Sequence, residues 1–149
     1  MVGSITPEQN ATAADACLAA INNRFGGSGI ETSVLNHSNA KKYAFVRIVC
    51  PPQHWIAVSK WMKYDLGVNY CSMVTGTHFP DGSPERGWEV AYHFLRQPVQ
   101  NQTPNTCTVH DVEALSGIDI PMEFEVLIPL PHGESPTVPS VQSIWVGAD

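Results

Sequence analysis

Charged residues are scarce in this sequence of 149 residues. Asp, Glu, Lys and Arg make up 15% of it, whereas they form roughly a quarter of an average globular chain. Basic residues are the scarcer kind, with 8 Lys and Arg against 14 Asp and Glu, and the net charge is −6. Affinity for a nucleic-acid backbone comes largely from Lys and Arg, so this balance argues against nucleic-acid binding. A weakly charged surface instead favours a protein that is covered by a partner.

Long apolar runs are also absent. No segment reaches the roughly 18 apolar residues that a membrane span requires. The N-terminal stretch MVGSITPEQN lacks the basic region and apolar stretch of a secretory signal. We therefore expect a cytosolic chain without a span of its own, and its length suits one domain with a real core.

Closely spaced cysteines are missing as well. Cys17, Cys50, Cys71 and Cys107 are far apart, and no Cys-x-x-Cys pair occurs. This spacing argues against a structural zinc site or an iron–sulfur cluster. Cys17, Cys50 and Cys71 lie inside apolar patterns, so we predict that they are buried and not joined in disulfides.

No catalytic motif stands out. The sequence has no His-Glu-x-x-His helix, no Gly-rich phosphate loop and no Gly-x-Ser-x-Gly elbow. His78 with Asp81 and His110 with Asp111 could each form a pair, but surface hydrogen bonds explain such pairs better than catalysis. We predict no catalytic, cofactor-binding or metal-binding residue. The competing hypothesis is a small metal or thiol enzyme that uses His78, His110 and the cysteines.

The spacing of apolar residues and the positions of Gly and Pro predict two helices and five strands. Thr6-Pro7-Glu8-Gln9 is a helix start with a capping box, and Gly26-Gly27 is a helix stop. The second helix places Trp55, Val58, Met62 and Leu66 on one face. In order, the predicted elements are a helix to Phe25, strands 30–36 and 43–50, a helix at 53–67, strands 68–79 and 87–96, and a strand at 123–130.

This order predicts an α+β fold in one domain, 1–149, with a single mixed or antiparallel sheet and the helices packed on one face. Trp55 and Trp88 lie on apolar faces and are predicted core residues. The segment 97–120 is rich in Gln, Asn, Thr and Pro and has no sustained period. We predict that it is a long loop inserted between two strands.

Three motifs resemble the 30 kDa-subunit family of complex I, the respiratory NADH:quinone oxidoreductase. They are GVNYCSMVTGTHFPDG, WEVAYHFL and EVLIPLPHGESPTVPSVQSIWVGAD. The same domain occurs in related ferredoxin- or F420-linked dehydrogenases and membrane-bound hydrogenases. The chain departs from the family pattern at His78, where relatives have Asp, and in segment 97–120. It also stops before the family's W-x-E-R-E tail, so we expect a short form or an incomplete frame.

The resemblance implies a non-catalytic structural subunit of the peripheral arm, at the cytoplasmic face of the membrane. One expected partner is the neighbouring subunit that helps to build the quinone site, which we call the quinone-site subunit. The other expected partners are the iron–sulfur subunits. These neighbours, and not this chain, would hold the iron–sulfur clusters, FMN and quinone.

The C-terminal motif is the most specific part of the resemblance. We therefore predict that segment 138–149 docks on a partner, the quinone-site subunit, through the residues that match the motif. These predicted interface residues are Pro139, Ser140, Val141, Ile144 and Trp145. Trp145 is the expected anchor, and the alternative is that Trp145 is a plain core residue.

Two other functions stay open from the sequence alone. One is the same domain in a membrane-bound [NiFe]-hydrogenase or a formate-hydrogenlyase-like complex. The other is a free-standing α+β binding module that acts as a small-ligand or regulatory domain. The sequence does not identify the electron donor or the kind of quinone.

Overall fold

The computed structural model describes residues 5–97, 121–133 and 136–145. Two α-helices, one short 3-10 helix and five strands make up this part of the chain. They are α1 (Pro7–Phe25), β1 (Glu31–Asn36), β2 (Ala44–Val49), η1 (Pro52–His54), α2 (Trp55–Tyr64), β3 (Tyr70–His78), β4 (Trp88–Arg96) and β5 (Met122–Leu130).

The start of α1 follows the sequence signature. The Thr6 hydroxyl accepts a hydrogen bond from the Gln9 N–H at 3.1 Å, and the Gln9 side chain accepts one from the Thr6 N–H at 2.9 Å. This reciprocal capping box is confirmed. At the other end, the Gly26 N–H bonds the Asn22 carbonyl at 2.8 Å. Gly27 then takes a φ of 85°, a left-handed conformation that glycine adopts without strain.

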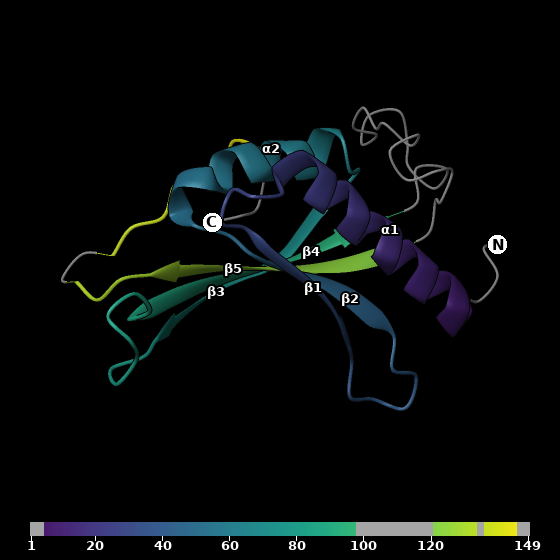
Figure 1. The fold of residues 1–149 in the computed structure, drawn as a ribbon, viewed down its shortest axis with the longest axis horizontal. Helices are drawn as coiled ribbons and strands as arrows, with labels where there is room; N and C mark the ends of the chain where they lie inside the picture. Colours follow the sequence, from purple (N-terminus) through teal and green to yellow (C-terminus); the bar gives the residue numbers. More distant parts are fainter. Residues whose placement is uncertain (1–4, 98–120, 134–135, 146–149) are drawn as a thin grey trace.

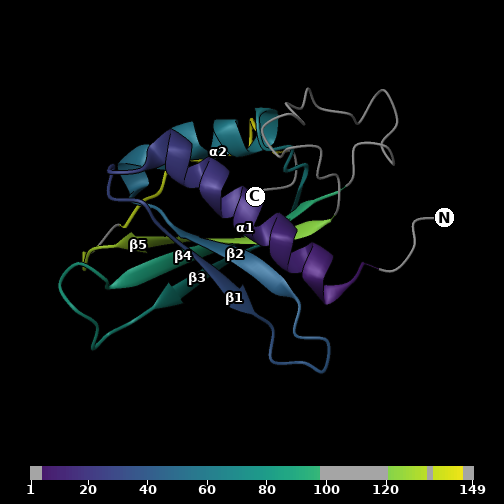
Figure 2. The ribbon, with the colours of Figure 1, turned by 45° about the vertical axis from the view of Figure 1, so that its right-hand side comes forward.

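The five strands form one mixed sheet in the order β1-β2-β5-β4-β3. β2 and β5 are parallel, with Val46 opposite Phe124, and the remaining neighbours are antiparallel. Both α-helices lie on the same side of this sheet, as two views show (Figures 1 and 2). The predicted α+β class and layer arrangement are therefore confirmed. We call the side opposite the helices the open face.

The core lies between the helices and the middle of the sheet. The predicted helix face of Trp55, Val58, Met62 and Leu66 is fully buried there. The Trp55 ring lies 4.9 Å from the Tyr92 ring and 6.1 Å from the Phe94 ring. Trp88 is different from the prediction, because it is half-buried and stacks on His78 at 4.0 Å. It begins β4 opposite His78, the last residue of β3, and packs against the margin of the core.

One buried charge was not predicted. Arg96 ends β4 and is 1% exposed, on the same side of the strand as Tyr92 and Phe94. Its Nε donates a hydrogen bond to the Leu66 carbonyl at 3.0 Å. The alternation of Trp88, Val90, Tyr92 and Phe94 already assigns position 96 to the helix side. Of the predicted loop 97–120, all but Gln97 lies outside the described residues.

Candidate interaction surfaces

The C-terminal segment is folded against the core. Residues 141–145 form a turn in which the N–H groups of Ile144 and Trp145 both bond the Val141 carbonyl, at 2.9 and 3.0 Å. The Lys63 ammonium of α2 donates to the Ile144 carbonyl. The Trp145 ring lies 4.4 Å from the Phe94 ring and 6.4 Å from the Trp55 ring.

This packing concerns three of the five predicted interface residues. Val141, Ile144 and Trp145 are 1%, 5% and 3% exposed within this chain, which favours the alternative that Trp145 is a core residue. The sequence showed an apolar segment but not that α2 and β4 would cover it. Pro139 and Ser140 are not buried and keep their predicted role as a proposal. Residues 146–149 lie outside the described part.

Among the described residues, His78 and the three thiols of the predicted enzyme alternative are not joined in a common site. His78 stacks on Trp88, and no hydrogen bond joins it to Asp81 in the described structure. Burial raises the pKa of Cys17 and of Cys50 to about 12, and the nearby Arg96 charge acts in the opposite direction on Cys17. Burial likewise raises the pKa of the Cys71 thiol. A thiol nucleophile needs a lowered pKa, so these three cysteines do not fit that role.

Metal-binding residues do not cluster either. Over the described ranges, no three His, Cys, Asp or Glu side chains lie close enough to hold an ion. His110 and Cys107, which the enzyme alternative also needs, are outside those ranges. His132 instead bonds the Gly82 carbonyl at 3.1 Å and packs against Gly87, where a Cβ would fall 2.6 Å from its ring. This histidine therefore holds the β3–β4 loop in place.

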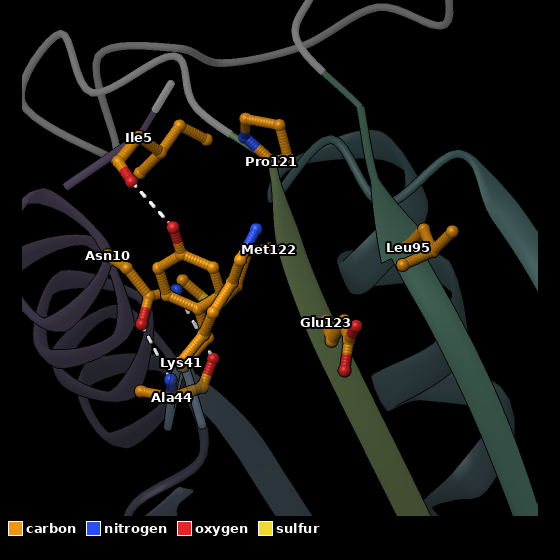
Figure 3. A pocket seen from close by; sticks show the side chains of 9 residues that line it. Ile5, Asn10, Lys41, Ala44, Leu95, Pro121, Met122 and Glu123 are labelled. Atoms are coloured by element: carbon orange, nitrogen blue, oxygen red, sulfur yellow. Dashed lines mark hydrogen bonds between the residues drawn. The ribbon is translucent and has the colours of Figure 1, made fainter. Parts of the chain in front are cut away.

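A hollow beside the start of α1 is bordered by several polar groups (Figure 3). The Asn10 side chain bonds both the N–H and the carbonyl of Ala44, at 2.6 and 3.3 Å. The Tyr43 hydroxyl donates to the Ile5 carbonyl at 2.8 Å. These polar groups tie α1 to β2 and are already satisfied, and Glu123 at the margin is paired with His37. Of the charged side chains that line the hollow, this leaves Lys41, which by itself does not make a binding site.

The open face of the sheet carries most of the strand charges. Alternation along the strands places four glutamates and one arginine there: Glu31, Glu89, Glu123, Glu125 and Arg47. Glu123 pairs with His37 at 2.5 Å, Glu125 with Arg47 at 3.4 Å, and Glu89 with Arg86. Between them, Phe45, Leu95 and Met73 line a shallow hollow. The face is therefore acidic with an apolar floor.

Strand β3 is the less protected edge of the sheet. β4 is the one described element with extensive backbone contact to it, whereas α1 lies along the other edge strand, β1. Tyr70 and Met73 on β3 are 51% and 52% exposed. This edge was not predicted as a site, although the stretch YCSMVTGTH shows its lack of charge and proline directly.

No described helix is both long and apolar enough to cross a lipid bilayer.

Comparisons with known proteins identify the fold and the family. A solved structure described as Nqo5, trypsin-resistant fragment 1–134, superposes with a TM-score of 0.57. The match covers 88% of this chain and 83% of that one at 16% identity, which shows a shared fold. A search by sequence among curated proteins gave no significant match. The family model "Respiratory-chain NADH dehydrogenase, 30 Kd subunit" matches residues 48–149, more than half of the sequence. The chain therefore belongs to the 30 kDa subunit family of respiratory-chain NADH dehydrogenase.

Proposed function

We propose that the chain is a structural subunit of the peripheral arm of a respiratory NADH:quinone oxidoreductase, at the cytoplasmic face of the membrane. It has no active site of its own and supports electron transfer to quinone by holding neighbouring subunits together. Those neighbours are the quinone-site subunit and the iron–sulfur subunits, and the chain binds no cofactor itself. The observation that carries this proposal is the family match over residues 48–149.

The described surfaces support a role in assembly. The acidic open face and the exposed outer edge of β3 are suited to contact with another chain. The buried thiols, with pKa values raised to about 12 at Cys17 and Cys50, do not suit a nucleophile. The stacked His78 is held by Trp88, and none of its described contacts is with a second titratable group.

The test is purification of an affinity-tagged full-length chain from its native cell, with identification of the chains that accompany it. We expect the quinone-site subunit and iron–sulfur subunits, and we expect that deletion of the gene lowers quinone reduction by NADH in membranes. Copurification of a nickel-containing large subunit would favour the hydrogenase alternative. A chain that purifies alone as a monomer, with quinone reduction unchanged after deletion, would contradict the proposal.

A further inference from the structure

The outer edge of β3 presents main-chain groups that no described strand pairs with. The Phe79 N–H bonds the Gly87 carbonyl of the adjacent segment at 2.8 Å. Paired residues alternate along an antiparallel ladder, so Val74, Gly76 and His78 direct their N–H and C=O groups away from β4. A bulge between Cys71 and Met73 disturbs the start of the strand but leaves this stretch regular.

Edge strands are normally protected against pairing by charges, proline, bulges or a covering segment. β3 contains no Asp, Glu, Lys, Arg or Pro. The opposite edge strand, β1, begins with Glu31 and lies along α1. Protection is therefore weak on one edge and present on the other, as expected where an edge is used for binding.

Two exposed apolar side chains lie on this edge strand. Tyr70 and Met73 are 51% and 52% exposed, the highest values among the large hydrophobic residues of the described part. Tyr70 and Met73 both belong to β3, and Met73 projects onto the open face opposite His93 of β4. An added strand would bring its own alternate side chains next to these two.

The charge of this surface selects the kind of partner. The strands place four glutamates and one arginine on the open face, while β3 itself carries no Asp, Glu, Lys or Arg. Three of these glutamates pair with His37, Arg47 and Arg86, so the open face keeps a smaller excess of negative charge, in a chain whose net charge is −6. A segment rich in Lys or Arg is attracted by this arrangement, and an acidic segment is repelled.

We propose that the free edge of β3 binds an extended basic segment of a neighbouring subunit, which adds to the sheet as a further strand. Main-chain hydrogen bonds to Val74, Gly76 and His78 supply the pairing. Tyr70 and Met73 contact apolar side chains of the segment, and its basic side chains lie over the acidic open face. This inference rests on the proposed function, because it names a surface by which the subunit is held in its complex.

Gly76 allows a matched test in the tagged full-length chain. Gly76→Pro removes an outward N–H and adds a ring at the edge, without removing a bond to β4. Gly76→Ala keeps the N–H, and its Cβ would meet no atom within 4 Å. We expect Gly76→Pro to reduce retention of the partner subunits at least about tenfold, the effect of leaving one buried polar group unpaired. Gly76→Ala should retain them at wild-type level.

A second pair of variants tests the charge and does not depend on strand geometry. Met73→Lys and Met73→Glu both alter an exposed side chain, so the fold should tolerate each. Met73→Lys should weaken retention several-fold more than Met73→Glu. A photo-crosslinking residue at Tyr70 should attach to a Lys- or Arg-rich segment of a copurifying subunit.

The outcomes separate this inference from the proposed function. If the wild-type chain retains no subunits, the proposed function fails. If it retains them and Gly76→Pro does so equally, strand addition is wrong. If Gly76→Pro lowers the melting temperature by more than a few degrees, the Met73 pair decides, and equal retention by its two members contradicts a basic segment. A dimer of the chain alone that Gly76→Pro disrupts would overturn the inference in favour of a second copy.

Discussion

Strands β5 and β3 make a matched comparison, because each has nine residues and each pairs antiparallel with β4. β5 lies in the middle of the sheet between β2 and β4, and most of its side chains are buried. β3 lies at the edge, and most of its side chains are exposed. Position in the sheet thus decides whether an apolar strand stabilises the domain or is available to a partner.

The largest expected contrast is between two tryptophans. Trp55 is buried in the core next to β4, whereas Trp88, the first residue of β4, is half-buried. Trp55→Ala should lower the free energy of unfolding by about 3–5 kcal/mol, as for emptying a large aromatic from a core. Trp88→Ala should cost about 1–2 kcal/mol. Urea titrations of both variants measure this difference. Equal losses of unfolding free energy would mean that Trp88 is packed as tightly as Trp55.

Trp145 extends the comparison to the C-terminal turn, residues 141–145, which packs on the core. Because Trp145 packs on Phe94 and Trp55, Trp145→Ala should destabilise the isolated domain by about 3 kcal/mol. Ser143→Ala, an exposed position in the same turn, serves as the control and should change stability by less than about 0.5 kcal/mol. Thermal melts of the two variants are the measurement. A folded Trp145→Ala domain with wild-type stability would restore Trp145 as a candidate interface anchor.

The smallest contrast concerns thiol reactivity in a Cys107→Ser background. Cys71 lies on β3 and is partly exposed, whereas Cys17 and Cys50 are buried. In a thiol-labelling experiment at mildly alkaline pH, Cys71 should react first, and the other two should react at the rate of opening of the structure. Mass spectrometry measures the labelling rate of each thiol. Equal rates for all three would contradict the expected difference between Cys71 and the two buried cysteines.

The raised thiol pKa values also fix a sign for the pH dependence. Cys17 and Cys50 have pKa values of about 12 in the folded chain, against 9.0 for an unperturbed thiol. Between these values the unfolded chain loses protons that the folded chain keeps. Their stabilising contribution is therefore complete below the unperturbed pKa of 9.0 and is lost as the pH rises toward about 12. Urea titrations at a series of alkaline pH values measure this loss.

Local signals account for most of the fold. The capping box at Thr6 and Gln9 is visible in four residues of sequence, and the helix face with Trp55 follows from periodicity alone. The covering of Trp145 could not be predicted, because an apolar run does not reveal which surface will bury it. The position of β5 between β2 and β4 could not be predicted from the sequence either, since strand order depends on contacts between distant residues. The β3 edge had a readable signal, an uncharged strand without proline, that gains meaning once β3 is known to be outermost.

The insertion of β5 has a consequence for how the chain acquires its structure during synthesis. β1 with β2 and β3 with β4 are neighbours in sequence and can pair locally. The strand that joins these two halves is made later, and its parallel contact links Val46 to Phe124. Contacts across such a separation form slowly, and the two halves then expose the inner edges of β2 and β4 until β5 arrives. A nascent chain of this protein is accordingly most vulnerable to aggregation just before residues 122–130 leave the ribosome.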